Sequence, residues 1–102
     1  MIVMLQKGKL SLRDSEDFSR FSLLCLDDIR PGVGRGPGGI EVTPEGHAWV
    51  PISTVVELRE PRPSKTWRLG FDEMIEKERG FGWIDEEGRR IRAHIADSAS
   101  QG

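Results

Sequence analysis

Residues 40–50 read IEVTPEGHAWV, a turn sequence between two segments in which apolar and polar residues alternate. Pro44 suits the second position of a tight turn, and Gly46 suits the left-handed position that ends it. With a three-residue loop, Thr43 faces His47 across the turn. Because side chains alternate between the two faces of a strand, this register predicts one core face, made of Ile40, Val42, Ala48 and Val50.

A second hairpin is predicted over residues 81–95, around a turn at residues 86–88 that reads EEG. Counting outward from the turn pairs Asp85 with Arg89, and therefore Trp83 with Ile91. This register predicts a buried face that contains Phe81, Trp83, Ile91, Ala93 and Ile95. It predicts an exposed face that contains Arg90, Arg92 and His94.

The N-terminal quarter of the chain predicts two short strands, over residues 2–5 and 9–13, because Leu10 and Leu12 alternate with polar neighbours. The acidic residues from Asp14 onward are typical of a helix start. Apolar residues that recur at spacings of three and four favour a helix ending by about Leu26; they are Phe18, Phe21, Cys25 and Ile29. A strand over residues 20–26 is the alternative.

The later part of the chain predicts a strand over residues 55–58, because its β-branched residues favour extended structure. Residues 72–79 predict a helix that stops at Gly80. Residues 66–71 fit the periodicity of a strand and that of a helix, and both alternatives stay open.

Two segments predict no regular structure. Residues 30–39 contain five glycines and two prolines, which penalise both helix and strand, so we expect a mobile loop. Residues 96–102 are small and polar, so we expect a disordered tail. The expected domain is therefore residues 1–95.

The fold class that these elements predict is α+β, in a small single domain. We expect a mainly antiparallel sheet of five or six short strands, with one or two helices on a face. A small SH3-like or OB-like barrel is the second choice. The length of 102 residues has room for one such domain and no more.

Composition excludes several classes of protein. Lysine and arginine number 15 against 17 aspartates and glutamates, so the strongly basic character typical of nucleic-acid binding is missing. Cys25 is the only cysteine, which excludes an internal disulfide. The apolar run at residues 1–5 is shorter than a signal peptide or a membrane span requires. We therefore expect a cytoplasmic protein without membrane attachment.

No recognisable motif predicts catalysis or cofactor binding. Residues 34–39 read GRGPGG and satisfy G-x-G-x-x-G, but a strand follows where a dinucleotide site needs a helix. Cys25, His47 and His94 lack the close spacing of metal ligands, so we predict no metal site and no cofactor.

Two short segments resemble known families. Residues 79–84, RGFGWI, and 91–95, IRAHI, resemble the paired nucleic-acid-binding strands of cold-shock domains, with Arg92 in the place of a stacking phenylalanine. The resemblance implies that aromatic residues stack on bases. Residues 48–58 resemble the last strands of SH3 domains, with Thr54 in the place of a peptide-binding tyrosine. We assign the chain to neither family. The predicted register buries Phe81 and Trp83, which would split a cold-shock stacking surface, and the chain has no tyrosine and lacks the opening A-L-Y-D-Y motif of SH3 domains.

The function we predict is a non-catalytic protein-interaction or accessory domain, with protein partners or self-association. Its candidate partner-binding residues are Arg30, Arg35, His47, Trp49, Arg90, Arg92 and His94, since exposed tryptophan and arginine are typical of interface hot spots. One alternative is a single-stranded nucleic-acid binder that uses Phe81, Trp83, Arg90, Arg92 and His94. Another is a small enzyme or enzyme subunit with an anion site near Asp27, Arg30 and Arg35.

Overall fold

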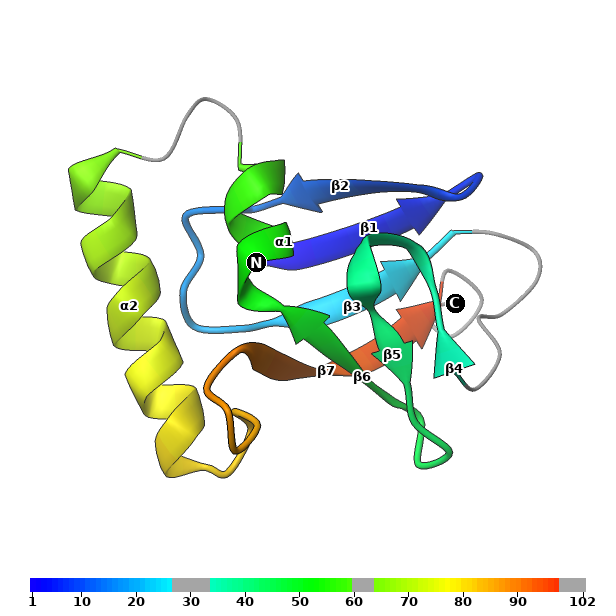
Figure 1. Ribbon diagram of the computed structural model, residues 1–102. Helices are drawn as coiled ribbons and strands as arrows, with labels where there is room; N and C mark the ends of the chain where they lie inside the picture. Colours follow the sequence, from blue (N-terminus) through cyan, green and yellow to red (C-terminus); the bar gives the residue numbers. More distant parts are fainter. Residues whose placement is uncertain (27–33, 60–63, 98–102) are drawn as a thin grey trace.

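The computed structural model describes residues 1–26, 34–59 and 64–97. In these ranges the chain forms one seven-stranded sheet, two α-helices and a 3₁₀ turn (Figure 1). The elements are β1 (Ile2–Gln6), β2 (Lys9–Arg13), β3 (Ser22–Cys25), β4 (Gly34–Arg35), η1 (Pro37–Gly39), β5 (Glu41–Val42), β6 (His47–Pro51), α1 (Ile52–Leu58), α2 (Lys65–Gly80) and β7 (Arg90–Asp97).

The strand order is β2-β1-β3-β7-β6-β5-β4. The α+β class is confirmed, but the expectation of a mainly antiparallel sheet is wrong: the sheet is mixed, because β3 runs parallel to both β1 and β7. The physical reason is that β2 ends beside the start of β1, and residues 14–21 cross from there to the other side of β1, so that β3 runs in the same direction as β1. Within the described ranges, β2 and β4 remain at opposite edges, and no pairing between them closes a barrel.

The helix predicted from Asp14 to Leu26 is wrong, and the alternative strand is correct. Residues 14–20 form turns and bends, and β3 follows. Leu23 and Cys25 are each 1% exposed, because the strands on both sides of β3 hold it in the centre of the sheet. Apolar spacing in this segment fits two periods, and pairing with two neighbouring strands favours the extended one.

The strand predicted over residues 55–58 is also wrong, because this segment belongs to α1. The helix begins directly after Pro51, and Val55 on its inner side is fully buried. Burial of one valine in the core outweighs the preference of β-branched residues for strands. Residues 66–71 take the helical alternative: α2 begins after Ser64, whose hydroxyl oxygen accepts a hydrogen bond from the Trp67 amide at 3.1 Å.

The glycine-rich segment is partly regular. Residues 27–33 lie outside the described residues, but Gly34–Arg35 form β4, which contradicts the expectation of irregular structure there. Pairing with β5 supplies hydrogen bonds that composition alone does not reveal. At the other end of the chain, β7 continues through Asp97, so two residues of the expected tail belong to a strand, and residues 98–102 are not described.

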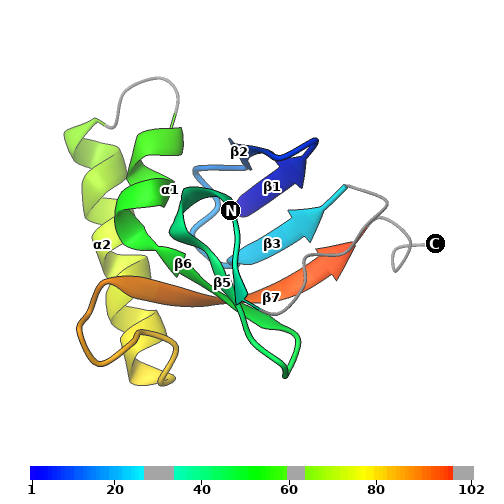
Figure 2. The same ribbon diagram turned by 45° about the vertical axis from the view of Figure 1, so that its right-hand side comes forward.

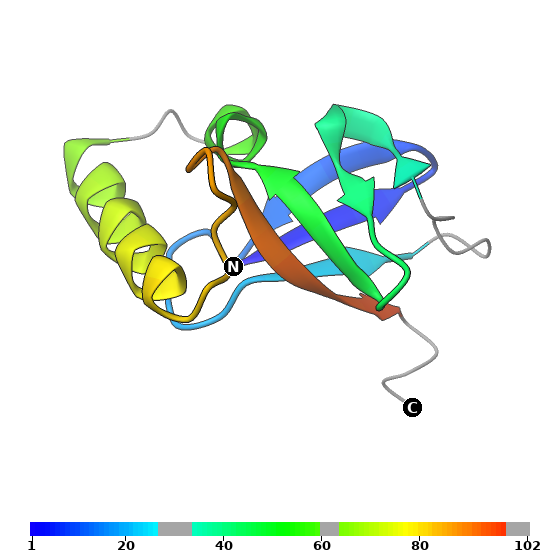
Figure 3. The same ribbon diagram turned by 60° about the horizontal axis from the view of Figure 1, so that its bottom comes forward.

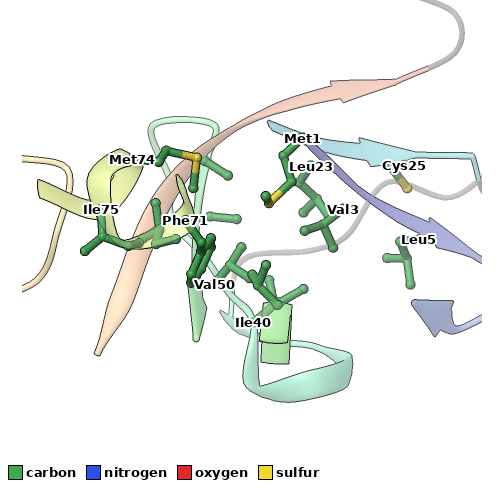
Figure 4. Close-up of a cluster of buried hydrophobic side chains, with 14 of the residues drawn as sticks. Met1, Val3, Leu5, Leu23, Cys25, Ile40, Val50, Phe71, Met74 and Ile75 are labelled. Atoms are coloured by element: carbon green, nitrogen blue, oxygen red, sulfur yellow. The ribbon is translucent and has the colours of Figure 1, made fainter. Parts of the chain in front are cut away.

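The hydrophobic core lies between the sheet and the two helices. Helix α2 runs along the end of the sheet at which β1 and β3 begin (Figures 1 and 2). Its side chains Phe71 and Met74 lie near Val50 of β6 in the buried cluster (Figure 4). Phe71 is 1% exposed, so its burial stabilises the fold by about 3 kcal/mol relative to exposure.

The first hairpin has the predicted register. Glu41 pairs with Trp49 and Val42 with Ala48, and the Thr43 amide donates to the His47 carbonyl oxygen at 2.8 Å. Gly46 has a φ of +84°, the left-handed conformation expected at the end of the turn. The predicted core face is confirmed, because Ile40, Val42, Ala48 and Val50 are all buried.

The second hairpin has the predicted turn but a register that differs by one residue. Gly88 has a φ of +71°, as expected, yet the Asp85 amide donates to the carbonyl oxygen of Arg90, not of Arg89. The reason is the Asp85 carboxylate, whose Oδ1 accepts from the amides of both arginines, at 2.8 and 3.1 Å. Arg89 is thus held in the turn, and Ile84, not Trp83, lies opposite Ile91.

Candidate functional site

The shifted register turns two aromatic side chains outward that the predicted register buried. Phe81 is 66% exposed and Trp83 is 37% exposed, so their prediction as core residues is wrong. The strand predicted over residues 81–85 is reduced to an isolated bridge between Ile84 and Ile91, and residues 81–82 form a turn after α2. The bridge places Ile84, in place of Trp83, opposite Ile91. The Arg92 amide donates to the Trp83 carbonyl oxygen at 2.8 Å, which places Trp83 beside Arg92 at the outer side of β7.

Helix α2 fixes these aromatic residues from the other side. The Trp83 amide donates to the Glu78 carbonyl oxygen at 2.9 Å, and the Gly82 amide donates to that of Arg79 at 3.1 Å. This pair of hydrogen bonds is the Schellman motif, with Gly82 at φ +79° as its left-handed residue. The helix terminus and β7 together therefore hold Trp83 in place, although residues 81–83 themselves are a turn.

The outer side of β6 adds a second tryptophan. Trp49 lies directly opposite Arg92 on the neighbouring strand β7. The two strands lie side by side in Figure 3. The Arg92 guanidinium lies 5.8 Å from the centre of the Trp83 ring, and the Arg90 guanidinium lies 5.4 Å from that of Trp49. The rings of Phe81 and Trp83 are 5.0 Å apart. We call these five residues, Phe81, Trp83, Arg92, Trp49 and Arg90, the aromatic–arginine surface.

The two arginines of this surface differ in their electrostatic surroundings. Arg90 donates from Nε to Asp85 at 2.8 Å and contacts Glu41 at 3.4 Å, so its charge is compensated. Burial alone would raise the pKa of Asp85, but hydrogen bonds from the Arg90 side chain and from the backbone outweigh it and lower that pKa. Among the described residues, no carboxylate pairs with Arg92.

The surface is hollowed beside Arg90. An open depression of about 690 Å³ lies between the start of α1 and the second hairpin turn. Its charged lining consists of Glu41, Asp85, Glu87, Arg89 and Arg90. The aromatic–arginine surface is thus apolar at the Phe81 end and mixed in charge at the Arg90 end.

Two histidines continue the outer side of β6 and β7. His47 lies directly opposite His94, two positions along from the Trp49 and Arg92 pair. Their ring centres are 6.3 Å apart, with one ring edge-on to the other. His94 is exposed and His47 is half-buried.

Five of the seven candidate partner-binding residues are thus brought together on one face: His47, Trp49, Arg90, Arg92 and His94. Arg30 lies outside the described residues. The backbone of Arg35 belongs to β4, three strands away from β7 in the sheet, and its side chain is not described. The structure therefore does not join these two arginines to the other five.

Phe81 and Trp83 are surface residues that the predicted register missed. Two signals in the sequence point to their position. One is Asp85, whose short acidic side chain can cap backbone amides and hold an extra residue in the turn. The other is Gly82, which suits the left-handed position after a helix better than Gly80 does.

Two further structural features bear on function. In the described part of the chain, no group of three or more histidine, cysteine, aspartate or glutamate side chains is arranged to hold a metal ion. No helix within residues 1–26, 34–59 and 64–97 is long and apolar enough to cross a membrane.

Comparisons with protein-family models, with curated proteins and with solved structures find no significant match to this chain.

Proposed function

We propose that the protein is a non-catalytic interaction domain and that a protein partner covers the aromatic–arginine surface. The observation that carries this proposal is the exposure of Phe81 and Trp83 beside Arg92 and Trp49. Tryptophan and arginine are the residue types enriched among interface hot spots, because each buries a large area while keeping a polar group that can be satisfied.

Arg92 specifies the chemistry of the partner. Its guanidinium lies 5.8 Å from the centre of the Trp83 ring, and its backbone pairs with that of Trp49 on β6. A partner that covers Trp83 and Trp49 therefore also removes the guanidinium from water. A charge buried without a counter-charge is strongly unfavourable. The partner therefore presents a carboxylate to Arg92, with apolar side chains on either side of it to contact the rings.

The charges around the surface favour a protein partner over a nucleic acid. Arg90 is already neutralised, and Glu41, Asp85 and Glu87 border the same end of the surface. The chain as a whole carries a net charge of -2. A phosphate backbone would meet this acidic border, whereas a folded protein can place its few acidic groups at Arg92 alone.

The proposal is tested by quantitative affinity purification from cells that express the protein. Trp83→Ala and Arg92→Ala are the two test variants, and Leu69→Ala is the matched control. Leu69 is also an exposed apolar residue, at 60%, but it lies twelve residues before Phe81, about 18 Å along the axis of α2. Both test variants should lose the same protein partner by about tenfold or more, and the control should retain it.

In a calorimetric titration, the purified partner should then bind the wild-type domain with one-to-one stoichiometry. Equal recovery of every partner by wild type, Trp83→Ala and Arg92→Ala would contradict the proposal. Circular dichroism spectra of all variants exclude unfolding as the cause of a loss.

Single-stranded nucleic-acid binding is the second candidate function, and the shifted register supports it. Phe81, Trp83 and Arg92 now lie on the same side of the second hairpin, as base stacking requires. The test is titration of dye-labelled dT and rU oligonucleotides with the protein while the fluorescence anisotropy of the dye is followed, a signal that does not depend on the tryptophan that is replaced. Binding that weakens steeply with salt and is lost in Trp83→Ala would favour this function over the protein interaction.

The enzymatic alternative stays a prediction. Two of its three residues, Asp27 and Arg30, lie outside the described residues. The side chain of Arg35 is likewise not described, so no geometry supports an anion site there.

A further inference from the structure

The two histidines of the chain, 47 positions apart in the sequence, form a direct cross-strand pair. The Thr43 amide donates to the carbonyl oxygen of His47, so the backbone of His47 is directed toward β5 and away from β7. The pair between His47 and His94 is therefore of the non-hydrogen-bonded type, in which opposing Cα atoms approach to about 4.5 Å and side chains lie closest.

The separation of the two rings is compatible with one bound metal ion. A metal–nitrogen bond of about 2.0 to 2.1 Å puts the ion about 3.2 Å from the ring centre, so two imidazoles on one ion have centres at most about 6.4 Å apart. The observed distance is 6.3 Å. Rotation about χ2, which is soft in histidine, turns the ring nitrogens toward a shared ion without moving the ring centres. A small change about χ1 brings the centres closer, toward the roughly 5.2 Å of tetrahedral coordination.

The ring nitrogens of both histidines are available as ligands. Among the described residues, neither imidazole takes part in a hydrogen bond or an ion pair, and the ring contact between His47 and His94 is the interaction that the structure records for their rings. His94 is exposed, so an ion can reach the pair from solvent.

We propose that His47 and His94 form a two-ligand site for a divalent transition metal ion on the outer face of the sheet. Its other coordination positions are open to water or to a side chain from outside the domain. Imidazole nitrogen suits Cu²⁺, Ni²⁺ and Zn²⁺, and Cu²⁺ binds tightest of the three in the Irving–Williams order. This site does not depend on the proposed protein interaction.

The position of the ligands explains why the sequence contained no signal for this site. Close spacing along the chain is the usual mark of metal ligands, and His47 and His94 have none. Pairing of β6 with β7 brings them together instead. The neighbouring Arg92 opposes binding by charge repulsion, so its removal should strengthen the site.

The test is calorimetric titration of the untagged protein with Cu²⁺ at pH 7.5, with electron paramagnetic resonance of the bound ion. The wild type should bind one Cu²⁺ with two imidazole nitrogens in its spectrum. His94→Ala and His47→Ala should each weaken binding by at least about tenfold, because each removes one of two ligands.

Arg92→Gln is the matched control, because it changes a neighbour on the same face and leaves both ligands in place. It should bind Cu²⁺ at least as tightly as the wild type does. Absence of binding by the wild type would overturn the proposal, and so would undiminished binding by His94→Ala. If His47→Ala fails to fold, the proposal is still tested by His94→Ala, which replaces an exposed residue, and by the two-nitrogen spectrum of the wild type.

Discussion

Replacing Trp67 and Trp83 by alanine, one at a time, distinguishes a tryptophan of the core from a tryptophan of the aromatic–arginine surface. Trp67 is 3% exposed, stacks on Phe71 at 4.8 Å, and donates from Nε1 to the Ser15 carbonyl oxygen at 2.6 Å. Trp67→Ala should therefore lower the free energy of unfolding by about 3 to 5 kcal/mol, the usual cost of a large-to-small change in a core.

Trp83→Ala should cost less. Trp83 is 37% exposed, and its recorded side-chain contacts are the Phe81 ring and the Arg92 guanidinium. An aromatic pair contributes about 0.5 to 1.5 kcal/mol and an exposed cation–π contact about 0.5 to 1 kcal/mol. These two contacts together contribute about 1 to 2.5 kcal/mol, and the partial burial of the ring adds to that. Trp83→Ala should therefore still cost less than Trp67→Ala, because Trp67 is almost fully buried.

The measurement is urea denaturation followed by far-ultraviolet circular dichroism, which does not depend on the tryptophan that is removed. The difference between the two variants decides the register of the second hairpin. A loss in Trp83→Ala as large as that in Trp67→Ala would mean that Trp83 is a core residue, opposite Ile91. That result would refute both the register and the surface built on it.

Three further predictions use the same denaturation assay. Gly70→Ala should destabilise the protein although alanine favours helices, because the new Cβ would lie 2.4 Å from the Phe18 ring. Gly80→Ala has open space around the new Cβ and should raise the free energy of unfolding by up to about 1 kcal/mol. Glu78→Gln should stabilise the protein at pH 7 by about 1 kcal/mol, because burial raises the pKa of Glu78 and its Oε2 has no hydrogen-bond partner among the described residues. The cost of the ionised Glu78 is absent below about pH 4 and complete above the folded-state pKa. Asp85→Ala should cost about 1 kcal/mol at pH 7, and because the pKa of Asp85 is lowered, this difference from wild type should shrink as the pH falls through the folded-state pKa. An unchanged stability of Gly70→Ala, or pH-independent effects at the two acids, would contradict these assignments.

Local signals in the sequence were sufficient where neighbouring residues alone set the structure. The first hairpin, its register and its core face follow from Pro44, Gly46 and the alternation around them. The turn at Gly88 follows in the same way. The helix over residues 72–79 follows from its periodicity, and the structure extends it to Lys65–Gly80.

Competing local signals were settled by contacts with distant parts of the chain. Residues 22–25 have spacings that suit a helix or a strand, and parallel pairing with β1 and β7 makes them a strand. Residues 55–58 prefer a strand by composition, but burial of Val55 against the core makes them helical. Propensities amount to tenths of a kcal/mol per residue, whereas burial of one apolar side chain contributes about 1.5 to 3 kcal/mol.

The sequence by itself therefore determined the α+β class, the two tight turns and the outward position of His47, Trp49, Arg90, Arg92 and His94. Only the tertiary structure decided that these residues share one face, because pairing of β6 with β7 joins residues 39 to 47 positions apart in the sequence. It alone also turned Phe81 and Trp83 outward. The physical reason is the Asp85 carboxylate, which accepts hydrogen bonds from the amides of Arg89 and Arg90 and so holds Arg89 in the turn. The register of the hairpin shifts by one residue as a result, and the alternation of apolar and polar residues alone cannot specify that shift.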